Sequence, residues 1–376
     1  MEIITGLQLT WFFLAGVVLI GYAVLGGYDM GVGSLYLFNK SKSQRKEMLA
    51  SIGPYWDANQ VWLITFGGGL FAAFPFAFST VWSGFYLAMI LLLVGLILRT
   101  VAIEFRYQLN TPRWSKIFDA CFGIGSLLPS ILFGAAMGNI LGGITLETSK
   151  TFAATKIFTG SFFDILNPYA LAMGVFSLVL FLFHGANFLN ATGKDDLRKD
   201  ARKKAKFLWV ILFALFGVIT AWTVLAESHA HQLQNFSNFP LLYALPLITV
   251  LALIIYPFTL KNVKSKIKPL LASVVAIVGL VGTAAATLFP RLVPDLNTVS
   301  KYAPTSLTDF ASEHLDASLT IYNAASSETT LLIMLIIAGI GVPTMLIYTI
   351  FVYRALFKAN SAKDKITSSA GVSTKA

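Results

Sequence analysis

The sequence predicts an all-α integral membrane protein with nine transmembrane helices, forming two four-helix bundles plus one helix. Of its 376 residues, 56% are hydrophobic and 12% are charged, whereas soluble globular proteins carry about 25% charged residues. The apolar residues are gathered in runs of roughly 20, which is the length needed to cross a bilayer as a helix. The basic residues lie almost entirely in alternate connections between these runs.

Nine runs are long enough to span. The N-terminal stretch "MEIITGLQLTWFF" lacks the basic region of a signal peptide, so the first apolar run is expected to be retained as a helix. An ordered outer loop is expected at about 290–328, within a membrane domain at 1–359, and the Ser-, Ala- and Lys-rich segment 360–376 is expected to be disordered. The expected spans, in order, cover residues 8–36, 57–77, 80–104, 118–141, 165–190, 207–226, 239–259, 268–289 and 329–354.

The connections fall into two groups by charge. The group that holds 23 of the 28 Lys and Arg residues consists of 38–50, 105–117, 191–206, 260–268 and the segment from residue 353 onward. The opposite group holds four. Cytoplasmic connections carry such an excess, so the N-terminus is expected outside and the C-terminus inside. The net charge of +10 is thereby explained without nucleic acid as a partner, and the basic side can attract anionic membrane lipid.

The division into bundles has two solutions. The basic loop 194–206 separates four helices before the fifth span from four that begin with the sixth. Alternatively, the first eight spans form two bundles of four, and the ninth is appended. In the first span, Gly27 and Gly31 are four residues apart, a spacing typical of closely packed membrane helices.

Ionisable side chains inside the membrane are rare and usually functional, and here they lie toward the cytoplasmic side. Asp29 is near the inner end of the first span, and Asp57 is at the inner start of the second. Arg99 and Glu104 fall in the inner third of the third span, and His184 falls in the inner half of the fifth. Carboxylates and histidine can relay protons. The pattern favours a proton or ion uptake route from the cytoplasm through these five residues.

Four of these five residues also have a purely structural interpretation. Asp57 could cap the second helix, where a carboxylate is favourable, and this role is compatible with proton transfer. Arg99 and Glu104 could extend to the inner interface, although Arg99 is also the natural partner for Asp29. His184 could be a hydrogen-bonded core residue.

The positions of three further side chains indicate structural roles. Asp119 opens the fourth span and is expected to cap that helix. Trp56 fits the interfacial aromatic belt, whereas Trp62 fits a core or partner-facing position.

The residue inventory argues against a cofactor held by this chain alone. A bis-histidine haem needs two histidines at membrane depth, and only His184 qualifies, because the other three, His229, His231 and His314, fall in outer segments. The single cysteine, Cys121, allows no internal disulfide, Cys-based metal cluster or C-x-x-C-H haem attachment. There is no P-loop, H-E-x-x-H motif or dinucleotide fingerprint, so we expect neither a catalytic residue nor a metal site in this chain.

Several motifs together resemble one known family. They are "GYDMGVG", "PYWDANQVWL", "FAAFPFAFS", "SGFYLAMILLLVGLILRTVAIEFR", "FHGANFL" and "DASLTIYNAASSETTLLIMLIIAGIGVPTMLIYT". In this order the set closely resembles subunit II of cytochrome bd-type quinol oxidases, from the first span to the ninth.

The resemblance implies a role. The chain would be the non-haem subunit of a complex in the aerobic respiratory chain of the bacterial cytoplasmic membrane, and would not be catalytic when isolated. Its partner, subunit I, would carry haem b and haem d and the main quinol site. The complex would take electrons from menaquinol or ubiquinol, take protons from the cytoplasm, and reduce dioxygen to water. Small single-helix subunits and membrane lipid are further expected partners.

The resemblance also implies roles for particular residues. Family members usually bring a proton route through the aspartate of the "WD" motif, which here is Asp57. Some bind a structural quinone in this subunit, and contacts to a quinone or to the partner are expected at Trp56, Trp62 and Asn59. Many relatives carry an acid three positions before the aspartate of "GYDMG", but here that position is Gly26, so no route through two acids on the first helix is expected.

Two other functions compete. A proton-coupled secondary transporter could use Asp29, Arg99 and His184 as a substrate or proton site, since transporters often have broken helices at the bilayer midplane. A purely structural scaffold is the other alternative, and it leaves the inner polar cluster without a purpose.

Overall fold

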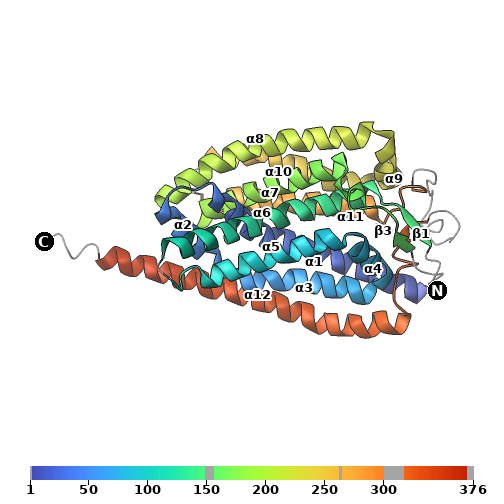
Figure 1. Cartoon of the computed structure of the whole chain (residues 1–376), viewed down its shortest axis with the longest axis horizontal. Coiled ribbons are helices and arrows are strands. Elements are labelled where there is room, and N and C mark those ends of the chain that lie inside the picture. The colour runs from blue at the N-terminus through green and yellow to red at the C-terminus, as the bar shows by residue number, and fades with distance from the viewer. Residues whose placement is uncertain (1, 110, 149–155, 262–264, 300–316, 371–376) are drawn as a thin grey trace.

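The computed structural model describes residues 2–109, 111–148, 156–261, 265–299 and 317–370, and its long helices run along one common axis (Figure 1). The N-terminus lies at one end, beside β1, β3, α4 and α9, and the C-terminus lies at the other. We call these the outer and inner ends, following the predicted topology. Short links and long apolar helices give a rod-like bundle whose two ends are chemically different.

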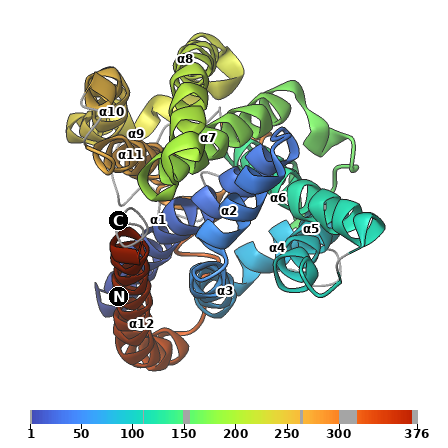
Figure 2. The same ribbon diagram turned by 90° about the vertical axis from the view of Figure 1, so that its left-hand side faces the viewer.

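The helices and strands are α1 (Glu2–Leu37), α2 (Lys42–Ile52), α3 (Trp56–Ala73), α4 (Pro75–Gly84), α5 (Tyr86–Phe105), α6 (Pro112–Gly142), β1 (Leu146–Thr148), β2 (Lys156–Phe158), η1 (Asp164–Leu166), α7 (Pro168–Thr192), α8 (Asp195–Leu225), η2 (Glu227–Leu233), α9 (Gln234–Asn238), η3 (Pro240–Tyr243), α10 (Ala244–Lys261), α11 (Lys268–Leu288), β3 (Arg291–Val293), β4 (Leu319–Thr320) and α12 (Glu328–Ala370). Among the described residues, eight helices are long and apolar enough to cross a membrane, and the bent pair α3–α4 makes a ninth candidate. The predicted all-α membrane fold is confirmed. The division into two four-helix bundles stays a prediction, because α1 contacts α3, α6, α7 and α11 alike (Figure 2).

The second expected span is not one continuous helix. α3 ends at Ala73, and α4 leaves it at an angle of 117°. The residue before a proline is pushed out of the helical region, and Phe74, which precedes Pro75, has φ −131° and ψ 62°. The expected boundaries at 77 and 80 were therefore wrong, and α4 ends at Gly84 before α5 begins. The Ser326 hydroxyl donates to the Ala72 carbonyl at 2.7 Å, and its N–H donates to Ala73 at 2.9 Å, so the outer loop closes the end of α3.

Two inner segments that were expected to be loops are helical. Part of the link 38–50 forms α2, which Ser41 caps. The basic segment 194–206 is mostly the first part of α8, where Leu197, Ala201 and Ala205 are buried at four-residue spacing. A buried stripe of this period stabilises a helix, while its lysines and arginines occupy the remaining faces. The segment was expected to be a loop because its overall composition is highly charged, and composition alone does not show the spacing of its few apolar residues.

Glycines let several helices touch backbone to backbone. A Cβ added at Gly31 would lie 1.8 Å from the Phe181 carbonyl oxygen of α7, and one added at Gly185 would lie 2.5 Å from the carbonyl carbon of Gly31. The close packing predicted from Gly27 and Gly31 is confirmed. α6 meets α7 in the same manner through Gly138, whose added Cβ would lie 2.9 Å from the Ala170 Cα.

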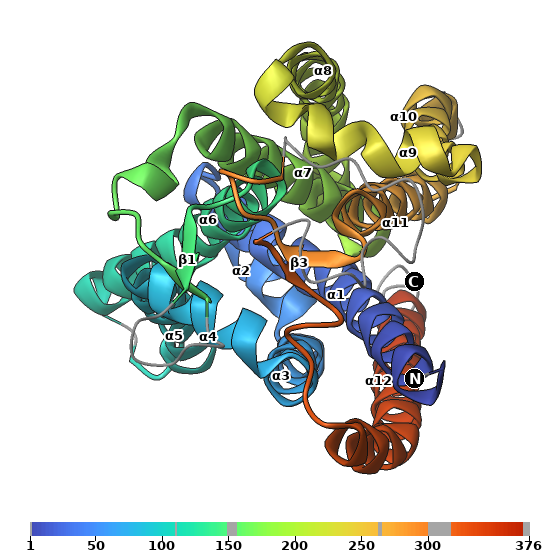
Figure 3. The same cartoon turned by 90° about the vertical axis from the view of Figure 1, so that its right-hand side faces the viewer.

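The outer end carries the irregular structure (Figure 3). β1 pairs with β2, and β3 pairs with β4, each in an antiparallel ladder. The Asp295 carboxylate accepts a hydrogen bond from the Leu146 N–H at 2.9 Å, which joins the two hairpin regions. Residues 300–316 of the expected outer loop, including His314, lie outside the described residues.

The last helix is longer than its apolar span. α12 runs from Glu328 to Ala370, whereas the apolar stretch ends at Arg354. Its helical backbone therefore extends into the segment 360–376, for which disorder is predicted, and residues 371–376 lie outside the described residues. The boundary at residue 359 stays a prediction.

Candidate functional site

The first feature of the inner half is a hydrogen-bonded ring around Asn59 of α3. The Asn59 amide nitrogen donates to the Tyr28 hydroxyl at 2.6 Å and to Oδ2 of Asp29 at 2.9 Å. The Tyr353 hydroxyl of α12 donates to Oδ1 of Asn59 at 2.9 Å, and the hydroxyls of Tyr28 and Tyr353 are hydrogen-bonded to each other. The ring joins the inner parts of three helices and links the buried carboxylate of Asp29 to the half-buried Tyr353.

The expected direct pairing of Asp29 with Arg99 is not formed. Among the described residues no ion pair joins them, and Asp29 takes its hydrogen bond from Asn59. Arg99 instead donates from Nη2 to Oε1 of Gln60 at 2.8 Å. The physical reason is that α3 carries two amide side chains at consecutive positions. Asn59 binds the carboxylate, and Gln60 binds the guanidinium. Arg99 remains within electrostatic reach of Asp29, and both side chains are fully buried, at 1% and 0% exposure.

Asp57 and Glu104 lie outside this network, on the surface of the chain. Both side chains are exposed. Asp57 falls in the first turn of α3, where a carboxylate complements the helix dipole, but Tyr55 occupies the N-cap position without a side-chain cap hydrogen bond. Asp57 thus lies at the inner end with its carboxylate available to a neighbouring molecule. The exposed position of Glu104, next to the last residue of α5, fits its structural interpretation as an interfacial group.

The two tryptophans of this region differ. Trp62 is 7% exposed, and its indole N–H donates to the Thr349 hydroxyl of α12 at 3.3 Å. Its ring packs so closely on α1 that a Cβ at Gly21 would overlap it, which places Trp62 in the core of this chain. Trp56 is half-buried at the start of α3.

His184 binds neighbouring helices through both ring nitrogens. Nε2 donates to the Val24 carbonyl at 2.9 Å, and Nδ1 shares a hydrogen bond with the Ser273 hydroxyl at 2.8 Å. The ring is fully buried between α1, α7 and α11. Because an axial haem ligand needs a free ring nitrogen, His184 does not fit that role in this arrangement. Among the described residues no hydrogen bond joins His184 to the Asn59 ring, although its imidazole lies beside the Tyr28 side chain, with ring centroids 6.1 Å apart.

Asp119 is the centre of a second polar cluster at the inner end. It accepts from the Tyr36 hydroxyl at 2.5 Å, from Nε of Arg106 at 2.5 Å and from Nη1 of Arg45 at 3.2 Å. The expectation that it caps its helix was wrong, because α6 begins at Pro112 and Thr111 caps it. Burial alone would lower the pKa of Arg106, but the hydrogen bond and charge of Asp119 outweigh burial and raise this pKa above its ordinary value. The cluster joins α1, α2, the end of α5 and α6.

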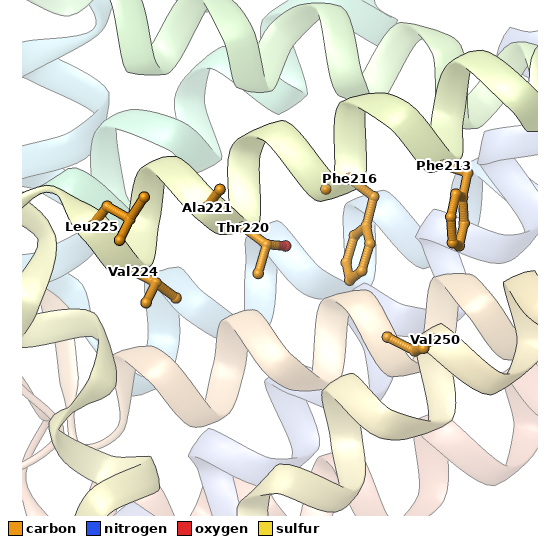
Figure 4. A pocket seen from close by; sticks show the side chains of 8 residues that line it. Phe213, Phe216, Thr220, Ala221, Val224, Leu225 and Val250 are labelled. Carbon is orange, nitrogen blue, oxygen red and sulfur yellow. The ribbon is translucent and has the colours of Figure 1, made fainter.

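One apolar pocket of about 470 Å³ lies between α8 and α10 (Figure 4). It is lined by Phe213, Phe216, Gly217, Thr220, Ala221, Val224, Leu225 and Val250. None of the predicted site residues borders it. Among the described residues, no three His, Cys, Asp or Glu side chains are grouped so that they could hold a metal ion.

The sequence interpretation missed the neutral members of the network. These members are Tyr28, Gln60 and Tyr353, although Gln60 directly follows Asn59 in the polar stretch "WDANQ". A search for every hydrogen-bonding side chain in the inner thirds of the spans would have included them. No sequence signal indicates that Tyr353, 325 residues from Tyr28, contacts it.

Comparison with known proteins gives a consistent family. A family model described as cytochrome bd terminal oxidase subunit II matches residues 7–356. The chain is 33% identical to a probable cytochrome oxidase subunit 2 of Haemophilus influenzae, with 93% of this chain and 94% of the relative covered. It is 32% identical to the cytochrome bd-I ubiquinol oxidase subunit 2 of Escherichia coli, with 95% of this chain and 96% of the relative covered.

The fold is also similar to a solved one. A chain in the structure of bd oxidase from Geobacillus thermodenitrificans matches with a TM-score of 0.68 and 18% sequence identity, covering 94% of this chain and 98% of that chain. The order of motifs, the membrane helices and the match over nearly the whole length agree. The chain therefore belongs to the cytochrome bd terminal oxidase subunit II family.

Proposed function

We propose that this chain supports the haem-bearing subunit of a quinol oxidase and contributes to its proton uptake from the cytoplasm. The observation that carries the proposal is the arrangement at the inner end. There the buried carboxylate of Asp29 is hydrogen-bonded through Asn59 to Tyr353, and Asp57 is exposed two positions before Asn59. A surface carboxylate next to a buried polar network is suited to collecting protons and transferring them inward.

The two carboxylates have different parts in this proposal. Asp57, exposed in the single chain, receives protons at the cytoplasmic side and passes them along the surface that meets the partner subunit. Asp29 and its ring are a second polar element, in which hydroxyl groups both accept and donate protons. The positive charge of Arg99 stabilises the ionised form of Asp29. His184 has a structural role, since its hydrogen bonds join neighbouring helices. Trp56 is half-buried beside Asp57 and is the aromatic side chain best placed for contact with the partner or with a quinone.

The haem groups are proposed to lie in the partner. His184 uses both ring nitrogens within this chain, which supports placing haem b and haem d in subunit I and leaving the isolated chain without catalytic activity. Relatives from Escherichia coli and Bacillus subtilis are named ubiquinol oxidase subunits, so a quinol is the proposed electron donor, either ubiquinol or menaquinol. A structural quinone, small single-helix subunits and bound lipid remain part of the proposal.

The test replaces Asp57 by Asn in the intact complex. We expect oxygen consumption with quinol to slow by about a hundredfold or more, since a positioned acid–base group typically contributes about 10²–10⁴-fold, while haem content and assembly stay normal. Asp196→Asn is the matched control, because Asp196 is an exposed carboxylate near the start of α8. Wild-type turnover in the Asp57 variant would reject its role in proton uptake. Failure to assemble would instead assign Asp57 a structural role.

The geometry offers the transporter alternative little support. Broken helices in transporters place backbone groups at the substrate site near the midplane. Here the break between α3 and α4 lies at the outer end, and Ser326 of the outer loop binds the carbonyl groups freed at the end of α3. Transport of a solute by this chain without its partner would favour the transporter.

A further inference from the structure

Three buried side chains leave polar atoms without hydrogen-bond partners in one part of the inner half. The unpartnered atoms are the Tyr22 hydroxyl, Oδ1 of Asp29, and Nε and Nη1 of Arg99. The three side chains are 3%, 0% and 1% exposed, and each lies within electrostatic reach of the other two. An unsatisfied polar group is strongly unfavourable inside a membrane, because no bulk water can replace the missing partner. Four such atoms in one place require a common explanation.

The two charged groups have separate anchors. Asn59 binds Oδ2 of Asp29, and Gln60 binds Nη2 of Arg99. Each amide thus occupies one atom of its charged partner, and the carboxylate and the guanidinium are held next to each other without pairing directly. The backbone of Arg99 is also fixed, because α6 packs so closely that a Cβ at Gly125 would lie 2.6 Å from the Arg99 nitrogen. Direct pairing would require these contacts to break.

Gly26 brings the phenol of Tyr22 toward the same place. A Cβ added at Gly26 would lie 2.4 Å from Cε2 of the Tyr22 ring, so the ring lies over the glycine, along the face of α1 that continues to Asp29. Positions 22, 26 and 29 share one helical face by their i, i+4, i+7 spacing. The Tyr22 hydroxyl thus lies on the side of α1 that carries Asp29, within electrostatic reach of Asp29 and Arg99, and its ring packs against Phe133 of α6.

We propose that Tyr22, Asp29 and Arg99 form a binding site for ordered water. A water molecule that accepts from Nε or Nη1 of Arg99 and donates to Oδ1 of Asp29 would join the two charges through solvent, and the Tyr22 hydroxyl would complete its coordination. Buried waters typically make about three such bonds. The water site itself holds whether or not protons pass through this chain. Its use as a proton station rests on the proposed function.

Radiolytic hydroxyl-radical footprinting of the intact complex tests the site, because radicals formed from bound water label adjacent side chains even when these are buried. We expect Tyr22 to be labelled well above Tyr256. Tyr256 is a matched reference, since it is 0% exposed and its hydroxyl donates directly to Oδ1 of Asn187 at 2.8 Å. Equal, low labelling of both tyrosines would overturn the proposal.

Two variants sharpen the result. Gly26→Ala displaces the Tyr22 ring and is expected to lower its labelling severalfold, whereas Gly16→Ala on the same helix, where an added Cβ meets nothing within 4 Å, leaves it unchanged. If Gly26→Ala does not assemble, the comparison of Tyr22 with Tyr256 in the unmodified complex still decides. Asp57→Asn should not change the labelling, so failure of the proton route and failure of the water site are distinguishable. In a map that resolves solvent, a direct Asp29–Arg99 contact or a quinone head group at this position would also overturn the proposal.

Discussion

The contact between α1 and α7 at Gly31 allows a change in stability to be predicted from interatomic distances. In Gly31→Ala, the added Cβ would lie 1.8 Å from the Phe181 carbonyl oxygen and 3.0 Å from the Gly185 Cα. A carbon and a carbonyl oxygen in contact are about 3.3 Å apart, so α1 and α7 must separate by about 1.5 Å at this level. The obstacle is backbone and cannot rotate away as a side chain would.

The cost follows from two contributions. Overpacking in a rigid interior costs typically 1–3 kcal/mol, and a backbone obstacle belongs at the upper part of this range. Separation also strains the hydrogen bond from His184 to the Val24 carbonyl, which is 2.9 Å long, and a lost hydrogen bond costs about 1 kcal/mol. The higher helix propensity of alanine returns up to about 1 kcal/mol. We therefore expect a net loss of about 3 kcal/mol.

Thermal denaturation of the purified complex measures this loss. A destabilisation of about 3 kcal/mol corresponds to a fall in the midpoint temperature of roughly 6–12 °C, from about 2–4 °C per kcal/mol in mid-sized proteins. Gly16→Ala is the control, with no expected loss, because its added Cβ meets nothing within 4 Å. If the two variants denature at the same temperature, the argument from backbone contact is refuted.

Two further predictions concern polar clusters. Asp119→Asn removes the charge that pairs with Arg45 and Arg106 at the inner end. We expect the free energy of unfolding to fall by about 2 kcal/mol, measured by the same denaturation assay, whereas Asp196→Asn should not change it. Equal stability of the two variants would contradict the role of Asp119 as the centre of this cluster. At the outer end, burial and then the nearby charge of His231 lower the pKa of His229. Because the unfolded chain binds a proton at His229 more readily than the folded chain, the folded state has its full stability above the unfolded pKa of about 6.5 and loses stability as the pH falls below it. His229→Gln should therefore reduce the acid sensitivity of the midpoint temperature. An unchanged pH profile would show that His229 does not cause this acid sensitivity.

The predicted elements differed from the structure where local composition and local conformation point in different directions. The segment 194–206 is rich in charge, which favours a loop by composition, yet its buried stripe of Leu197, Ala201 and Ala205 makes it helical. Pro75 inside an apolar run was a readable signal for the break between α3 and α4, because proline restricts the residue before it. These two features depend on neighbours in sequence and were in principle predictable.

The sequence predicted some of the residues of the candidate site, but it did not predict their hydrogen-bond partners. Asp29, Asn59 and Arg99 were selected because charged and polar side chains in apolar helices are few. Their partners were assigned wrongly for Asp29 and Arg99, because the choice between an ion pair and two amides depends on how far α3 is rotated against α1 and α5. Asp57 and Asn59 are two positions apart in one helix, yet one is exposed and the other buried.

The sequence by itself determined the membrane-spanning class, the number of candidate spans, the expected sidedness and the family motifs. Span length and charge are local properties, and the bilayer selects for them directly. Tertiary structure alone decided that Tyr353 reaches Asn59 from 294 residues away, that both nitrogens of His184 are used, and that Tyr22, Asp29 and Arg99 lie within electrostatic reach of one another with unpartnered atoms. These contacts depend on the rotation and register of packed helices. Close backbone contacts at glycines such as Gly31 and Gly125 fix both.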